Sequence, residues 1–220
     1  VAATKAGVNL DAPQEIDVYL ENDANVEYCT QFVKDVYNME KSERDALLYT
    51  NEVGENSAKI GARPGSQEFV ANLTKKWLRD ARAEGFEVVL VDGRTLEGIA
   101  TEMHNEQLCE YRVGLYFICD AKIGARRTLG YAKTPYGELT DTEQRDVDDL
   151  VAQIGERNAR DFERTTERLA RPEHALVWTL PDEPPVTQTG KRPLVIVDTS
   201  AEISKYEMSR PVAQFVAEHL

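Results

Sequence analysis

Cysteine, histidine and long apolar runs are all scarce in this chain of 220 residues. Its three cysteines, Cys29, Cys109 and Cys119, are far apart and odd in number, which argues against a disulfide scaffold and a paired zinc motif. The three histidines are equally scattered, and because metal ligands usually come in short local pairs, no metal site built on them is expected. The longest apolar run, Val113 to Cys119, is far shorter than the roughly 18 residues of a membrane span. We therefore expect reduced thiols, a cytoplasmic location and no membrane partner.

Basic residues are in deficit, since 39 acidic residues face 26 basic ones and the formal net charge is −13. Non-specific binding to nucleic acid needs a basic face, so no nucleic-acid partner is expected. The charge does not exclude a small anionic substrate, because a local arginine cluster can hold phosphate when distant charges are screened. With 41% apolar and 30% charged residues, the chain can build a sizeable core.

Four apolar segments predict strands, at Phe86–Val91, Arg112–Cys119, His174–Leu180 and Leu194–Asp198. The first two are almost continuously apolar, which is typical of strands buried on both faces. Helical patterns lie between the segments. A strand–helix–strand–helix order implies parallel pairing, so the predicted fold class is α/β, with a parallel sheet flanked by helices.

The clearest helical pattern runs from Ser66 to Glu84, with Ser66 as N-cap and Gly85 as the stop. A long charged helix is expected from Asp141 to Leu169, with a break near Gly155 as one reading. Further helices are expected at 1–7, 42–48, 51–62, 121–132 and from Ser204 or Ser209 to Leu220, with Pro211 in the first turn of the last one. Glu15–Leu20 is expected to be a strand, and residues 27–38 show no clean period.

The tripeptide Asp92-Gly93-Arg94 directly follows the first apolar segment. In open α/β sheets, ligands bind beyond the carboxyl ends of the strands. An aspartate at that place can orient magnesium-bound water, and an arginine can hold a transferring phosphoryl group. The alternative interpretation is an ordinary Asp-Gly turn.

A second candidate is the arginine-rich segment ERNARDFERTTER. Arg157, Asp161 and Arg164 fall on one helical face at i, i+4 and i+7. Two guanidinium groups beside a carboxylate can grip a phosphate while the carboxylate accepts a donor from a base or sugar. The alternative is a solvated helix with salt bridges along its surface. Arg126 and Arg127 are a third candidate, as lid arginines that close over phosphates or as a plain basic helix end.

These segments, taken in order, resemble a bacterial-type cytidylate kinase, a nucleoside monophosphate kinase. IGERNARDFERTTERLARPEHALV, residues 154–177, is similar to a signature segment of that family in residue type and spacing. LYTNEVGENSAKIGARP resembles the segment of its monophosphate-binding region, and VAATKAGVNLDAP looks like the helix and loop that follow its first nucleotide-binding unit. The resemblance covers nearly the whole chain.

The resemblance implies one P-loop-kinase-like domain over residues 1–220. Its core would comprise about 1–10, 76–124 and 170–220, its monophosphate-binding lobe about 11–75 and its helical lid about 125–169. The implied reaction transfers a phosphoryl group from ATP, with Mg²⁺, to CMP or dCMP.

The resemblance also implies roles for particular residues. Arg157, Asp161 and Arg164 would contact the nucleoside monophosphate, and Arg94 would contact its phosphate. Asp92 would lie near magnesium. Arg126 would act from the lid. We therefore expect Asp92, Arg94 and Arg126 to be catalytic residues.

The chain departs from the family pattern at three places. The family's aspartate after the DGR tripeptide is Thr95 here, and its serine and arginine in the monophosphate-binding region are Ala58 and Gln67, with Ser57 and Arg63 nearby. No Gly-x-x-x-x-Gly-Lys-Ser/Thr loop occurs in these residues. We expect such a loop upstream of residue 1. The alternative is a non-catalytic binding or structural subunit, with residues 181–193 as a docking loop for a protein partner.

Overall fold

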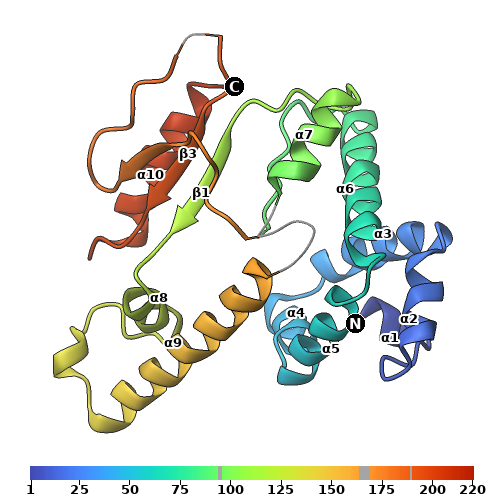
Figure 1. The fold of residues 1–220 in the computed structure, drawn as a ribbon, viewed down its shortest axis with the longest axis horizontal. Coiled ribbons are helices and arrows are strands. Elements are labelled where there is room, and N and C mark those ends of the chain that lie inside the picture. The colour runs from blue at the N-terminus through green and yellow to red at the C-terminus, as the bar shows by residue number, and fades with distance from the viewer. Residues whose placement is uncertain (94–95, 164–168, 189) are drawn as a thin grey trace. The chain divides into compact units, whose positions relative to one another are not determined.

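The structure, a computed structural model, describes residues 1–93, 96–163, 169–188 and 190–220. It divides into two compact units (Figure 1). The helical unit comprises Val1–Val91 and Asn105–Cys109, and the sheet unit comprises Asp92–His104 and Glu110–Leu220. Within the described residues, no helix combines the length and the apolar character that crossing a membrane requires. The division into core, lobe and lid that the resemblance implies stays a prediction.

The helical unit consists of short helices joined by tight loops. Its elements are α1 (Ala2–Lys5), α2 (Pro13–Leu20), α3 (Ala24–Tyr37), α4 (Lys41–Leu48), α5 (Asn51–Gly61) and α6 (Ser66–Ala83). The helices predicted at 42–48, 51–62 and 66–84 are confirmed. A helix also precedes Gly7, whose φ of +82° is the left-handed conformation typical of a helix stop.

The strand expected at Glu15–Leu20 is wrong, because these residues lie in α2. Pro13 is the first helical residue, where the N–H that proline lacks would have no partner in any case. Ile16 and Leu20, four residues apart, are both buried and share one face of the helix. The stretch without a clean period is α3, which buries Val26, Cys29, Thr30 and Val36.

One hydrophobic cluster holds the helical unit together. It contains Ala3, Leu10, Ile16, Tyr19, Leu20, Val26, Cys29 and Phe69. Inside it, Tyr19 Oη lies 3.1 Å from Cys29 Sγ. Burial, together with this hydrogen bond, raises the pKa of Tyr19 above its usual value. Cys29 is a free cysteine that packs in this core.

α6 ends at Ala83, and Gly85, which has a φ of +85°, terminates it as predicted. The Gly85 N–H donates to Arg82 O and the Phe86 N–H to Ala81 O, so the last carbonyls of the helix are satisfied. The expected N-cap is wrong by one residue, because Gly65 is the N-cap and Ser66 is the first helical residue.

The apolar run that follows α6, Phe86–Val91, is not a strand in this structure, which corrects the prediction. Its side chains are exposed rather than buried: Phe86 is 61% exposed and Leu90 81%. An apolar run becomes a strand only when neighbouring strands satisfy its backbone groups. Among the described residues, this run has no ladder partner.

The sheet unit combines a small parallel sheet with helices. Its elements are α7 (Glu97–Asn105, of which the last residue belongs to the helical unit), β1 (Gly114–Ile118), α8 (Ala121–Thr128), a 3₁₀ turn (Tyr136–Glu138), α9 (Asp141–Phe162), β2 (Leu176–Thr179), β3 (Leu194–Asp198) and α10 (Lys205–Ala217). Three of the four predicted strands are therefore confirmed. The fold class is α/β, with a three-stranded parallel sheet flanked by helices.

The strand order is β1-β3-β2, and both pairings are parallel. β3 is central: Ile196 pairs with Tyr116 of β1 and with Val177 of β2. β1 begins at Gly114, where a Cβ atom would come within 2.5 Å of Leu194 Cδ1, so a larger residue would require that side chain to move. Because all three strands run the same way, their carboxyl ends meet at one edge of the sheet.

One face of the sheet is covered by α10 (Figure 1). Val195 and Val197 of β3 and Trp178 of β2 are almost fully buried against Phe215 of α10, whose ring centroid lies 5.5 Å from that of Trp178. Ser204 caps α10 in a capping box with Glu207, which agrees with one of the two predicted starts. Pro211 consequently lies inside the helix and not in its first turn, which corrects that expectation.

α8 and α9 form a helical hairpin beside the sheet. Thr140 caps α9 in a capping box with Glu143. Ala125, Leu139 and Val147 form the buried cluster between the two helices. α9 runs through Gly155 without a break, so the break considered there is wrong. A glycine inside a helix lowers its stability by about 1 kcal/mol and need not interrupt it.

Candidate functional site

The carboxyl ends of β1 and β3 carry a dense set of polar residues. The last residues of the two strands, Ile118 and Asp198, are register partners. Beyond them, the Thr199 N–H and hydroxyl both donate to Ile118 O at 2.9 Å. The Asp120 N–H donates to Ser200 Oγ at 2.8 Å. These bonds join the segment after β1 to the segment after β3, as the topology of a parallel sheet predicts for a ligand-binding edge.

Ser200 and Asp198 form a local turn at this edge. The Ser200 N–H and hydroxyl both donate to Asp198 Oδ1, at 2.9 and 2.6 Å. Hydrogen bonds from Ser200 stabilise the charged carboxylate and lower the pKa of Asp198 below its usual value. The segment after β3 is therefore held by its own side chains and presents backbone carbonyls to α8.

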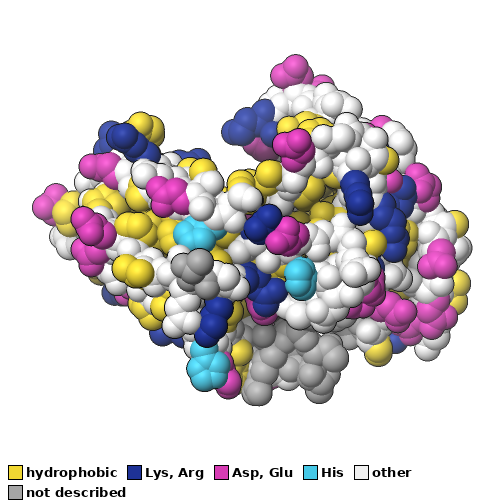
Figure 2. Space-filling view, turned by 90° about the horizontal axis from the view of Figure 1, so that it is seen from above, with side chains coloured by type: hydrophobic (Ala, Val, Ile, Leu, Met, Phe, Trp, Pro, Cys, Tyr) yellow, Lys and Arg dark blue, Asp and Glu magenta, His cyan; other side chains and the backbone are white. Residues whose placement is uncertain are grey.

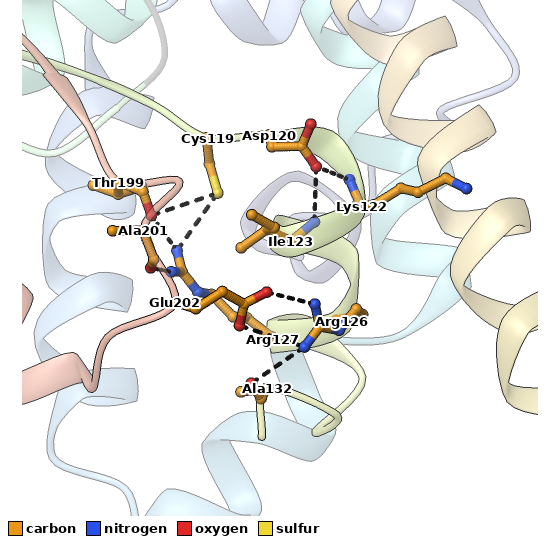
Figure 3. Close-up of polar contacts among 10 residues, drawn as sticks. All are labelled: Cys119, Asp120, Lys122, Ile123, Arg126, Arg127, Ala132, Thr199, Ala201 and Glu202. Carbon is orange, nitrogen blue, oxygen red and sulfur yellow. Dashed lines mark hydrogen bonds and ion pairs between the residues drawn. The ribbon is translucent and has the colours of Figure 1, made fainter. Parts of the chain in front are cut away.

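Asp120 positions α8 at the same edge. Its carboxylate accepts hydrogen bonds from the N–H groups of Lys122 and Ile123, at 3.0 and 3.1 Å, and so caps the helix (Figure 3). With its start fixed in this way, α8 directs Arg126 and Arg127, in its last turn, at the segment between β3 and α10.

Arg126 is nearly buried, with 5% of the residue exposed. Its Nη1 donates to Glu202 Oε1 at 2.6 Å, and its Nη2 lies 3.4 Å from both Glu202 Oε2 and Ala132 O. Its Nε is buried and has no hydrogen-bond partner in the part of the chain that the structure describes. Glu202 therefore neutralises this predicted site residue.

Arg127 holds the segment after β3 by its backbone. Its Nη1 donates to Thr199 O at 2.7 Å and its Nη2 to Ala201 O at 2.6 Å, while Cys119 Sγ lies 3.5 Å from Nη1 (Figure 3). Both terminal nitrogens are thus engaged with backbone carbonyls. The two adjacent arginines differ: Arg127 binds backbone, and Arg126 binds a carboxylate.

The structure does not bring together all the residues that the sequence singles out. Asp92 is exposed, and because no strand precedes it, the interpretation that it follows a strand end is not supported. Arg94 and Thr95 lie outside the described residues. Arg126 makes no polar contact with Asp92 or Arg157 among the contacts described. The role of Asp92 near magnesium stays a prediction.

The arginine-rich segment is helical up to Phe162, as predicted. Arg157 and Asp161 lie one turn apart in α9; Arg157 is exposed and Asp161 is 4% exposed. Arg164 lies outside the described residues. An open hollow of about 430 Å³ borders this end of α9, and its lining includes Tyr116 of β1 and Phe162.

In the helical unit, Arg63 is committed to an internal partner. Its Nε and Nη2 donate to the two carboxylate oxygens of Asp17, at 2.7 and 2.5 Å. This bidentate pair lowers the pKa of Asp17 and raises that of Arg63, in each case mainly through the hydrogen bonds. Ser57 and Ala58 are exposed on α5, and Gln67 is half-buried in α6. Arg63 therefore forms an ion pair with Asp17 inside the helical unit.

Three residues at the sheet edge were missed by sequence reasoning: Asp198, Ser200 and Glu202. Asp198 and Ser200 carried a usable signal, because polar residues directly after an apolar strand fall at the ligand-binding edge of a parallel sheet. Glu202 carried none, since its partner is 76 positions away in sequence.

The surface charges agree with the composition. Figure 2 shows acidic and basic side chains interspersed on the face that it presents, with no single basic patch. In the described ranges, no three His, Cys, Asp or Glu side chains gather in a group that could hold a metal ion. Compared with known proteins, the chain matches no protein-family model, no curated protein and no solved structure.

Proposed function

We propose that this chain functions as a nucleoside monophosphate kinase of the cytidylate type, which transfers a phosphoryl group from ATP to CMP or dCMP. The observation that carries the proposal is the position of Arg157 and Asp161 on one unbroken helix, a single turn apart. A guanidinium group and a carboxylate at that spacing can serve the phosphate and the base or sugar of one nucleotide. The parallel α/β sheet is a scaffold on which such sites are common.

In this proposal, Arg157, Asp161 and Arg164 bind the monophosphate nucleotide, Arg94 binds its phosphate, and Arg126 stabilises charge on the transferred group. Catalysis consists of positioning and charge neutralisation, because phosphoryl transfer needs little covalent chemistry from the protein.

Magnesium would arrive with the phosphates of ATP. Mg²⁺ keeps several waters and is commonly held by one or two carboxylates together with substrate phosphates. The single exposed carboxylate of Asp92 fits that mode of binding. Bound there, the ion would neutralise charge on the phosphates, while Asp92 would orient one of its waters.

The proposal requires a phosphate-binding loop, and residues 1–220 contain none with the Gly-x-x-x-x-Gly-Lys-Ser/Thr pattern. Turnover is therefore expected only from a polypeptide that supplies such a loop. Binding of the monophosphate can be tested without it.

The test is a calorimetric titration of this chain with CMP, dCMP and UMP. Arg157→Gln should weaken CMP binding by about tenfold or more, the usual loss for a hydrogen bond to a charged group. Arg145→Gln is the matched control, because Arg145 is also exposed and lies on the same helix. Equal CMP affinity in the two variants, or no CMP binding at all, would contradict the proposal.

A second candidate function is a non-catalytic binding or structural subunit. The observation that favours it is the engagement of Arg63 and Arg126 by Asp17 and Glu202, which leaves neither guanidinium open to a phosphate as it stands. A longer polypeptide that carries the phosphate loop, binds CMP and shows no CMP-dependent ATP turnover would favour this candidate.

A further inference from the structure

The exposed run Phe86–Val91 has the composition of a segment that pairs as a strand. Its sequence, FEVVLV, is rich in β-branched residues, carries a single charge and contains neither proline nor glycine. Its five apolar side chains are each at least 42% exposed, and in the described ranges the run pairs with no strand. The Phe86 N–H donates to Ala81 O and so fixes the start of the run to the end of α6. The backbone beyond Phe86 is left without a ladder partner in those ranges.

Once extended, the run divides into two unequal faces. In a strand, successive side chains point to opposite faces. Phe86, Val88 and Leu90 would share one face, and this face is wholly apolar. The single charge, on Glu87, would lie on the other face. The best partner strand therefore places apolar side chains opposite the first face and leaves Glu87 toward water.

A second copy of the same run is such a partner. In an antiparallel pair with a two-fold axis at Val88, the two Val88 side chains lie opposite each other, and Phe86 lies opposite Leu90 of the second copy. All six apolar side chains then share one face in directly opposed pairs. A shift of the register by one residue would place Glu87 opposite Leu90 or Val88 and break up this face. The run is thus complementary to itself in one register, as a two-fold interface requires.

We propose that Phe86–Val91 is a dimerisation strand, which pairs antiparallel with the same run of a second copy about a two-fold axis at Val88. The two strands satisfy each other's backbone groups, and Phe86 of each copy packs on Leu90 of the other. Each copy contributes six residues, so the buried area falls at the low end of protein interfaces, where complexes are weak. Well below the dissociation constant, the chain is monomeric and the run is exposed. The proposal is independent of the proposed kinase reaction.

Sedimentation equilibrium of the full chain over a range of concentrations tests for the dimer. The unmodified chain should change from monomer to dimer as its concentration rises. Leu90→Lys should weaken the dimer by about tenfold or more, because a charge would then lie opposite Phe86 on the apolar face. Val18→Lys is the matched control, since Val18 is 68% exposed on α2 of the same unit, and the dissociation constant should not change.

Disulfide cross-linking tests the register. The variants carry Cys109→Ser and Cys119→Ser, which leaves the buried Cys29 as the remaining native thiol. Val88→Cys should form a disulfide-linked dimer on mild oxidation, because directly opposed residues have Cα atoms about 4.5–5.5 Å apart. Val91→Cys is the matched control. Val91 is similarly exposed, at 42% against 47% for Val88, but its two copies would lie about 20 Å apart in this register.

Circular dichroism establishes that each variant is folded, which is expected because the substituted residues of the run are exposed. A chain that stays monomeric up to about 1 mM would overturn the proposal. So would a dimer that Leu90→Lys does not weaken, or that Val18→Lys weakens equally, because another surface or the added charge would then explain the result. Equal cross-linking of Val88→Cys and Val91→Cys would overturn the register. Assemblies larger than a dimer would overturn the two-fold pairing, which closes with two copies.

Discussion

Two apolar runs of similar composition differ in this protein, because one forms a buried strand and the other forms none. Leu194–Asp198 is the central strand of the sheet, and its Val195 and Val197 are 0% exposed. Phe86–Val91 forms no strand and is exposed, with Leu90 at 81%. The first run has a strand on each side and α10 over one face. Strand formation therefore follows from available partners rather than from the apolar residues themselves.

The largest expected effect comes from comparing one buried phenylalanine, next to the central strand, with one exposed phenylalanine in the run at 86–91. Phe215→Ala should destabilise the sheet unit by about 3–5 kcal/mol, because Phe215 is 2% exposed and packs on Trp178. Phe86→Ala, at a residue that is 61% exposed, should change the free energy of unfolding by less than about 0.5 kcal/mol. Urea unfolding followed by the fluorescence of Trp178, in a Trp77→Phe background, measures the first effect.

Subtracting the signal of the Trp77→Phe chain from that of the chain with both tryptophans gives the fluorescence of Trp77, which belongs to the helical unit and reports on Phe86→Ala. A loss of several kcal/mol in this variant would break the comparison. It would mean that the run from Phe86 to Val91 is buried in solution and has strand partners after all.

The same contrast explains how much of the fold could be predicted. Helices such as α6 were predictable because their apolar residues repeat at a local period and a glycine ends them. β1, β2 and β3 were predictable as strands because each has an apolar run and, in the folded chain, a partner. The run at 86–91 has the same local pattern, but it has no neighbouring strand among the described residues. Whether an apolar run finds a neighbouring strand cannot be predicted from the residues of that run alone.

In the candidate site, too, local features could be predicted from the sequence and distant partners could not. That Arg126 and Arg127 lie at the end of a helix after an apolar strand was visible in the sequence. Their partners were not, because Glu202, Thr199 and Ala201 lie more than 70 positions away. Arg157 and Asp161 are neighbours on one helix and could be paired by spacing alone.

A stability loss of intermediate size is expected when the N-cap of one helix in each unit is removed. Ser204 begins α10 with a full capping box, whereas Thr50 begins α5 with one hydrogen bond, from the Val53 N–H at 3.2 Å. Ser204→Ala should cost about 1–2 kcal/mol and Thr50→Ala about 0.5–1 kcal/mol. Urea unfolding, followed by Trp178 for the first variant and Trp77 for the second, gives the two values. An equal or reversed order would show that the second bond of the capping box contributes nothing here.

The smallest expected effect is a difference between the two units in how their stability changes with pH. The Arg63 guanidinium lowers the pKa of Asp17 in the folded protein, mainly through its hydrogen bonds. A lowered folded-state pKa gives stability that is present above the unfolded pKa of about 3.9 and is lost as pH falls through the folded value. The stability difference between the unmodified chain and Asp17→Asn should therefore be largest near neutral pH and should shrink below about pH 4.

Unfolding transitions at a series of pH values, followed by Trp77, measure this difference. Asp23→Asn is the matched control, since Asp23 is exposed and its side chain makes no capping hydrogen bond. The transition that Trp178 reports should not respond to Asp17→Asn, because Asp17 and Arg63 both belong to the helical unit. If the stability difference did not depend on pH, the contribution of Asp17 would come from packing and not from its ion pair with Arg63. The ion pair would then not explain why Arg63 is unavailable to a phosphate.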